Sequence, residues 1–201
     1  MAEDQEEIDS YELTNNNITI SKLQVALRTG AHALQSKLDQ LTRNADTQMQ
    51  EGLFALLQQT ATLLLDKSEF WTHVLARSQT LDSREAAEDL FYELLMQERA
   101  RSIVKLSMNE RTPDQSSPEQ FRSNRNSDYI VVTLLLSTAD NQPLFDEIYS
   151  ASLLRDVLQE ITMMRSRYLM VFELLWVPQA ANDTLTDREM QSAYREMVAI
   201  G

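Results

Sequence analysis

Cysteine is absent from this chain of 201 residues, and glycine, proline and histidine are rare, at three, four and two residues. Without a thiol the chain has no disulfide, thiolate metal ligand or cysteine nucleophile, which fits a reducing compartment. The scattered glycines, Gly30, Gly52 and Gly201, leave no glycine-rich loop to cradle a phosphate. His32 and His73 lie far apart without a carboxylate at metal-ligand spacing, so we expect no metal and no other cofactor.

Positive charge is also scarce, because 18 Lys and Arg oppose 31 Asp and Glu and the formal net charge is −13. Such a surface repels nucleic acid and anionic lipid, so we expect no nucleic-acid partner. No apolar run approaches the roughly 18 residues that span a bilayer, and the acidic N-terminus is unlike a signal peptide. We therefore expect a soluble, cytoplasmic protein without a transmembrane segment.

The composition divides the chain into an acidic tail and one domain. Residues 1–17 contain six carboxylates and neither Lys nor Arg, which predicts a disordered tail, with an autoregulatory arm as the alternative. Within the domain, residues 18–201, apolar side chains recur every three or four positions over 21–44 and again over 49–64. This spacing predicts an N-terminal helical hairpin over 18–66, which packs on the rest of the domain or, alternatively, on a coiled-coil partner.

The remainder of the domain alternates between strand and helix patterns. We expect a helix near residues 85–106 with a kink or break at the polar run Gln97-Glu98-Arg99, a helix over 150–161 capped by Ser150, and a final helix that begins at the capping-box pair Thr186 and Glu189. We expect strands at 71–81, 129–136, 144–148 and 168–177, and the unbroken apolar run of 129–136 is typical of a strand covered on both faces. The predicted fold class is α+β: the helical hairpin, then a ferredoxin-like (split βαβ) antiparallel sheet with helices on one face, then a short C-terminal helix. Residues 109–128, polar and with two prolines, should form a mobile loop. Its three arginines could alternatively dock an acidic partner.

Glu173 is the most interesting single residue, because it is a carboxylate within an otherwise apolar predicted strand. If Glu173 is buried, its pKa should rise unless a cation such as Arg165 or Arg167 meets it, and general acid chemistry would then be open to it. The alternative is a strand residue paired across the sheet, which the lack of an accompanying carboxylate favours. We therefore predict no catalytic residue.

Two tryptophans and one distinctive segment complete the candidate residues. Trp71 and Trp176 could be core residues or interface anchors. Pro178 should end its strand, because proline has no amide to continue the ladder. Four segments resemble a known family, and the most specific one runs from Trp176-Val-Pro-Gln179 to Asp183-Thr184-Leu-Thr. The others are residues 18–27, residues 45–47 with 51–53, and residues 129–134.

Over residues 18–190 the chain resembles an uncharacterised cyanobacterial and chloroplast family, catalogued as domain of unknown function 1517, to which the plant fluctuating-light-acclimation protein is similar. The resemblance implies a photosynthetic setting and a regulatory role near thylakoid membranes, with no catalytic residue to carry over. Many relatives have a glycine-rich region and a membrane segment that this chain lacks before Ile18. We therefore expect peripheral thylakoid association through a protein partner.

The leading hypothesis is a non-enzymatic regulatory or protein-interaction domain, whose candidate contact residues are the two tryptophans, Glu173 and the distinctive segment around Pro178. One alternative is a small-ligand sensor or enzyme with a pocket between the helical hairpin and the sheet, with Glu173 inside it. Another alternative is a structural subunit of a larger complex.

Overall fold

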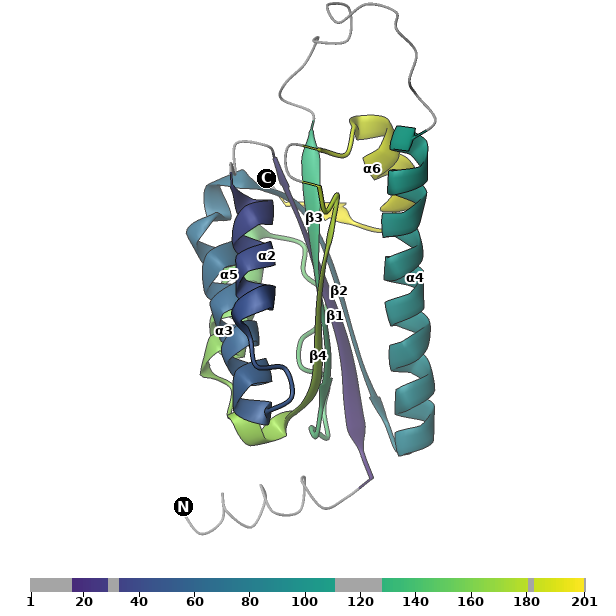
Figure 1. The fold of residues 1–201 in the computed structure, drawn as a ribbon. Helices are drawn as coiled ribbons and strands as arrows, with labels where there is room; N and C mark the ends of the chain where they lie inside the picture. The colour runs from purple at the N-terminus through teal and green to yellow at the C-terminus, as the bar shows by residue number, and fades with distance from the viewer. Residues whose placement is uncertain (1–15, 29–32, 111–127, 181–182, 201) are drawn as a thin grey trace, which may run out of the picture.

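The computed structural model describes residues 16–28, 33–110, 128–180 and 183–200 (Figure 1). Most of the predicted acidic tail and most of the predicted mobile loop therefore lie outside the described residues. A five-stranded antiparallel sheet, in the order β4-β3-β1-β2-β5, forms the centre of the molecule. The strands are β1 (Ile18–Arg28), β2 (Trp71–Leu81), β3 (Tyr129–Thr138), β4 (Leu169–Val177) and β5 (Val198–Ala199).

Helices cover both faces of this sheet (Figure 1). One face carries α2 (Leu34–Asn44), α3 (Gln50–Asp66) and α5 (Ala151–Met163), and the other carries α4 (Arg84–Glu110) and α6 (Asp187–Ala193). Two 3-10 turns, η1 (Ser68–Phe70) and η2 (Ser166–Tyr168), lead into β2 and β4. The class is α+β, as expected, but the prediction that the helices share one face is wrong.

The predicted N-terminal helical hairpin over 18–66 is also wrong, because residues 18–28 form β1, the central strand of the sheet. Leu23 and Leu27 are four residues apart, which suits a helix, yet Leu23, Val25 and Leu27 also share one face of a strand. Helices cover both faces of β1, so every residue of this strand before Arg28 is buried, and burial does not alternate along it. The β-branched residues, and the alternation of polar and apolar side chains over 22–25, were the remaining signals of a strand.

The ferredoxin-like topology fails at the predicted return strand, because residues 144–148 adopt no regular secondary structure. Phe145 and Ile148 are buried in the main core, which explains their strand-like spacing. The place between β2 and β3 is instead taken by β1, which pairs with both of them. The strand predicted at 71–81 coincides with β2, and β3 and β4 lie where strands were expected.

The two faces of the sheet are packed differently. The face under α2, α3 and α5 forms one large apolar core, in which Leu57, Leu64 and Leu134 have no exposed surface. The face under α4 and α6 carries two smaller apolar clusters, one near Ile20 and one near Tyr129. Polar side chains lie between these two clusters, and they form the site described next.

Candidate functional site

A buried polar cluster fixes α4 on the sheet. Glu98 of α4 is 1% exposed, and its carboxylate lies 3.5 Å from Nζ of Lys22 on β1. Gln24 donates from Nε2 to the same carboxylate at 3.0 Å and to Oγ1 of Thr133 on β3 at 2.9 Å. A buried ion pair offsets its desolvation only when further hydrogen bonds satisfy it, as Gln24 does here. The cluster thus joins α4, β1 and β3 through one carboxylate.

Arg101, one turn after Glu98 on α4, extends this cluster toward the end of the chain. Its guanidinium donates to Glu98 and lies over the ring of Tyr194, 5.0 Å from the ring centroid. Tyr194 is buried, and burial together with the nearby Glu98 carboxylate raises the pKa of its phenol well above the ordinary value. The phenol therefore stays neutral, and its ring supports Arg101 by packing.

Arg101 lines two cavities. The larger has a volume of ≈ 420 Å³ and lies between α4 and the segment that contains α6. Its walls include apolar side chains and three cations, Arg101, Lys105 and Arg188, with one carboxylate, Glu189. The smaller has a volume of ≈ 250 Å³ and is also lined by Arg101. The lining of the larger cavity therefore has more cations than carboxylates, although the chain as a whole is acidic.

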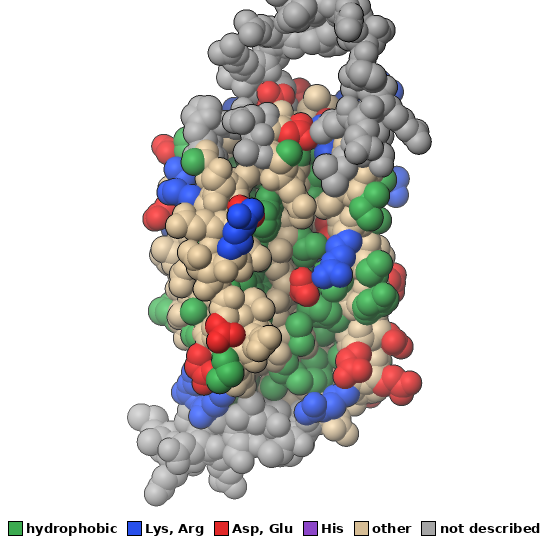
Figure 2. Space-filling view, viewed as in Figure 1, with side chains coloured by type: hydrophobic (Ala, Val, Ile, Leu, Met, Phe, Trp, Pro, Cys, Tyr) green, Lys and Arg blue, Asp and Glu red, His purple; other side chains and the backbone are tan. Residues whose placement is uncertain are grey.

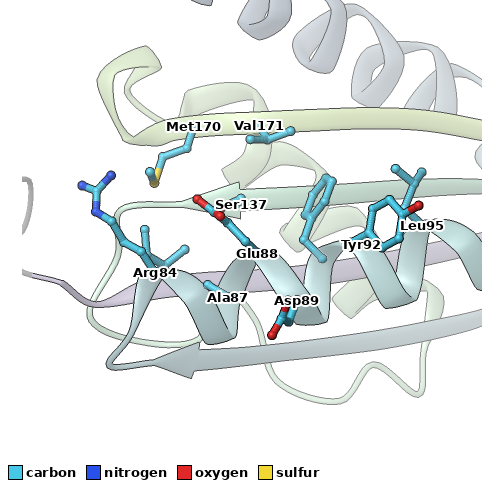
Figure 3. A pocket seen from close by; sticks show the side chains of 11 residues that line it. Arg84, Ala87, Glu88, Asp89, Tyr92, Leu95, Ser137, Met170 and Val171 are labelled. Atoms are coloured by element: carbon cyan, nitrogen blue, oxygen red, sulfur yellow. The ribbon is translucent and has the colours of Figure 1, made fainter.

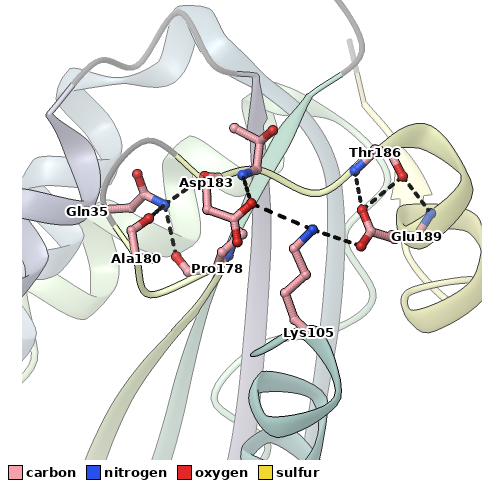
Figure 4. A network of polar contacts seen from close by, with 8 residues as sticks. Gln35, Lys105, Pro178, Ala180, Asp183, Thr186 and Glu189 are labelled. Atoms are coloured by element: carbon pink, nitrogen blue, oxygen red, sulfur yellow. Dashed lines mark hydrogen bonds and ion pairs between the residues drawn. The ribbon is translucent and has the colours of Figure 1, made fainter. Parts of the chain in front are cut away.

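The segment that joins β4 to α6 is held from both faces of the sheet (Figure 4). Nζ of Lys105 on α4 lies 2.8 Å from Glu189 and 3.7 Å from Asp183. Gln35 of α2 donates from Nε2 to the backbone oxygens of Pro178 at 2.9 Å and of Asp183 at 3.0 Å. These contacts fix the segment's backbone relative to helices on opposite faces of the sheet.

Glu189 has two roles in this arrangement. It completes the capping box of α6, in which Thr186 accepts from the amide of Glu189 and Glu189 accepts from the amide of Thr186. It also accepts the hydrogen bond from Lys105. Burial alone would raise the pKa of Glu189, but the hydrogen bonds from Lys105 and Thr186 outweigh burial and lower this pKa below its ordinary value.

The predicted site residues fall into three different places. Trp71 and Trp176 are buried in the main core, where Nε1 of Trp71 donates to the backbone oxygen of Leu64 at 3.1 Å. Glu173 lies on the face under α4, and its carboxylate is 3.6 Å from the guanidinium of Arg99. A pocket between the sheet and α2 or α3 would therefore not include Glu173.

The family-motif residues Pro178, Gln179, Asp183 and Thr184 gather in the segment after β4. Pro178 is buried and follows a cis peptide bond, whereas Gln179 is exposed. Asp183 accepts a hydrogen bond at 2.8 Å from the amide of Thr184. Another family-like segment, residues 45–47 with 51–53, brings two stretches of backbone close together. A Cβ at Gly52 would lie 2.0 Å from the backbone oxygen of Asp46, so only glycine fits there.

Sequence reasoning missed the residues that organise the site. Glu98 and Arg99 lie in the polar run that was expected to weaken α4, yet α4 is continuous and buries Glu98. Lys22 and Gln24 alternate with Leu23 and Val25, which was a usable signal of a strand with polar side chains on one face. Nothing in the local pattern links these residues, because Lys22 and Glu98 are 76 positions apart.

A second surface lies between the N-terminal half of α4 and β4. Two large apolar side chains are exposed there, Tyr92 by 63% and Val171 by 41%. Figure 2 shows apolar side chains gathered in the strip between α4 and the opposite helical layer. A groove of ≈ 470 Å³ runs along this strip, with Tyr92 and Leu95 on one side and Val171 on the other (Figure 3). We call this surface the α4–β4 face.

Within residues 16–28, 33–110, 128–180 and 183–200, no helix is long and apolar enough to cross a bilayer. In the same part of the chain, no three His, Asp or Glu side chains are grouped so that they could hold a metal ion.

Comparison with known proteins identifies the family. Residues 17–200 match the profile of the family described as protein of unknown function (DUF1517). Protein FLAP1 homolog A of Synechocystis sp. (strain ATCC 27184 / PCC 6803 / Kazusa) is 28% identical over 190 residues, which cover 90% of this chain and 56% of that protein. FLUCTUATING-LIGHT-ACCLIMATION protein 1, chloroplastic, of Arabidopsis thaliana is 27% identical over 195 residues, which cover 95% of this chain and 49% of that protein.

The chain spans about half the length of the curated relatives that it matches. No solved structure matches it significantly. The family profile, in contrast, extends over nearly the whole chain, from β1 through β5. The chain therefore belongs to the DUF1517 family.

Proposed function

We propose that this chain is a non-enzymatic regulatory domain with a photosynthesis-related role, and that it acts by binding another protein through the α4–β4 face. The names of the two relatives support the photosynthetic setting, since one is chloroplastic and is named for acclimation to fluctuating light. The exposure of Tyr92 and Val171 on the walls of one groove is the observation that carries the proposed mode of action. Large apolar side chains gathered on one surface commonly mark protein-binding sites.

The position of β4 supports an extended partner segment. β4 is the last strand of the sheet and, among the described residues, pairs only with β3. An edge strand leaves backbone N–H and C=O groups available, and a segment of another protein can add to it as a further strand. Side chains of such a segment that point toward α4 would enter the groove beside Tyr92.

Charge around the groove favours a basic partner. Residues 84–93 expose one cation, Arg84, and four carboxylates, Glu85, Glu88, Asp89 and Glu93, so their formal charge is −3. Two of these carboxylates line the groove itself. A basic segment would therefore be steered toward this face, and raised salt would weaken the complex. A second copy of this acidic chain would be repelled.

The ion pairs of three carboxylates on the α4 side support a structural rather than a catalytic role for these three groups. Glu98 contacts Lys22 and Arg101, Glu189 contacts Lys105, and Glu173 contacts Arg99. Each of them thus has a cation partner within the fold. The ion pair at Glu173 joins α4 to β4, which supports a role in holding the groove together.

Affinity capture from photosynthetic cells with matched variants tests this proposal. We expect the wild type to retain a basic protein in a salt-sensitive manner, and Tyr92→Ser with Val171→Ser to lose it. Met163→Ser is the control, because Met163 is 73% exposed and lies at the end of α5, on the other helical layer. The proposal fails if the double variant retains the partner, if the control loses it equally, or if the wild type captures nothing specific.

A further inference from the structure

We propose that the ≈ 420 Å³ cavity between α4 and α6 binds an apolar carboxylic acid, with its carboxylate at Arg101 and Arg188 and its apolar body inside the cavity. This site is separate from the α4–β4 face, and the two surfaces share none of the residues that define them. The inference therefore does not depend on the proposed protein partner.

The size and walls of the cavity suit a small organic molecule. Its volume falls within the range of roughly 300 to 1,000 Å³ that is typical of ligand pockets. Val104, Val177, Leu185 and Ala193 supply apolar walls, and the ring of Tyr194 supplies another. An entirely polar anion would leave these walls in contact with water, whereas an apolar body attached to a carboxylate would cover them.

The charge of the cavity specifies an anion. Three cations and one carboxylate line it, so the formal charge of the lining is +2, whereas that of the whole chain is −13. Lys105 is already engaged by Glu189 at 2.8 Å. Arg101 is engaged by Glu98 through Nη1. Arg188 and the remaining N–H donors of Arg101 are therefore best placed to bind a ligand, and a guanidinium can hold a carboxylate through parallel hydrogen bonds.

Arg101 is held in position before any ligand arrives. Its bond to Glu98 uses Nη1, and Glu98 is itself fixed by Lys22 and Gln24. A guanidinium has several further N–H donors, so the bond to Glu98 leaves others for an incoming carboxylate. The ring of Tyr194 supports the guanidinium face. A preorganised cation of this kind loses little side-chain entropy when it binds an anion.

The smaller cavity is lined by the same guanidinium and gives a ligand further room. Arg101 lines both cavities, and so does Tyr194. Gln24 and Arg195 are among the polar residues of the smaller one. A carboxylate at Arg101 would therefore lie where the two cavities adjoin, at the polar end of the larger, more apolar one.

Fluorescence titration of the full chain with cis-parinaric acid, and with its methyl ester, tests the inference. We expect saturable binding of one molecule of the acid per chain and much weaker binding of the ester, which has the same apolar body without the charge. Arg188→Gln should weaken binding of the acid about tenfold, the effect expected for one charged hydrogen bond. It should leave binding of the ester unchanged.

Two further variants keep the test specific. Ala193→Phe, which places a ring in the exposed wall formed by α6, should abolish binding of the acid without unfolding the chain. Arg84→Gln, in the groove of the α4–β4 face, should leave it unchanged. The assignment would be overturned if the acid showed no saturable binding or bound no better than the ester. It would also be overturned if Ala193→Phe left binding of the acid unchanged, or if Arg84→Gln weakened it equally.

Discussion

The two faces of the central sheet differ in what they bury. Under α2, α3 and α5 the sheet meets one continuous apolar core. Under α4 and α6 it meets two small apolar clusters, the ion pair of Lys22 and Glu98, and cavities that adjoin solvent. A continuous apolar core stabilises a fold, whereas ligand and protein binding commonly use polar groups, cavities and exposed aromatic side chains. We therefore expect the first face to stabilise the fold and place both proposed binding sites on the second.

The largest loss of stability should follow from removing the charge of Glu98. Glu98→Gln preserves the shape of the side chain but leaves Lys22, which is 5% exposed, and Arg101 without their counter-charge. We expect the free energy of unfolding to fall by about 3 to 5 kcal/mol, as when one partner of a buried ion pair is removed. Urea denaturation measures it, and a loss below about 1 kcal/mol would show that water screens the cluster.

A matched change on the apolar face should cost nearly as much but leave the cavity intact. Leu57 of α3 is fully buried in the main core. Leu57→Ala should lower the free energy of unfolding by about 2 to 5 kcal/mol, because it removes apolar contacts and leaves a void. Binding of parinaric acid should stay unchanged below the unfolding transition. If Leu57→Ala weakened binding of parinaric acid as strongly as Arg188→Gln does, the proposed separation of roles between the two faces would be contradicted.

A smaller loss of stability is expected where the first turn of α3 meets the segment that precedes it. Gly52 leaves no room for a side chain, since a Cβ there would lie 2.0 Å from the backbone oxygen of Asp46. Gly52→Ala should force the turn to shift and destabilise the fold by about 1 to 3 kcal/mol, despite the higher helix propensity of alanine. Thermal unfolding can measure this change. An increase in stability in Gly52→Ala would contradict the close approach of Gly52 to the backbone of Asp46.

The smallest effect should be a dependence on pH at the contact between Lys105 and Glu189. The pKa of Glu189 is lowered in the fold from its ordinary value of 4.5, so its contribution to stability is present above that value and is lost as pH falls through the lowered pKa. Glu189→Gln should therefore lower the melting temperature near pH 7. The gap between the variant and the wild type should narrow as the pH falls below 4.5 and through the lowered pKa of Glu189. A gap that is constant with pH would contradict an ionic contribution.

Local sequence patterns predicted the elements whose signals are local. The unbroken apolar run of β3 indicated a strand covered on both faces. Ser150 caps α5 and accepts from the amide of Leu153, and Thr186 begins the capping box of α6, as their spacing suggested. Pro178 directly follows the last residue of β4. Each of these signals is carried by residues that are close together in the sequence.

The failures have a common physical cause, which is tertiary burial. In β1 and at Phe145, packing produced an apolar spacing that local rules assign to the wrong element. The polar cluster could not be predicted, because Lys22 and Glu98 lie 76 positions apart and meet only when α4 crosses β1. Glu173 had a candidate cation in the segment before its strand, but the structure pairs it with Arg99 of α4. Long-range pairings of this kind need the topology first.

Site-specific photo-crosslinking in living photosynthetic cells tests the assignment of the two faces most directly. A photoreactive residue would replace Tyr92 on the α4–β4 face or Met163 at the end of α5, which are 63% and 73% exposed. Because both positions are exposed, neither replacement should disturb the fold. We expect a discrete crosslink to a basic protein from position 92 and none from position 163. Crosslinks from position 163 alone, or the same product from both, would contradict it.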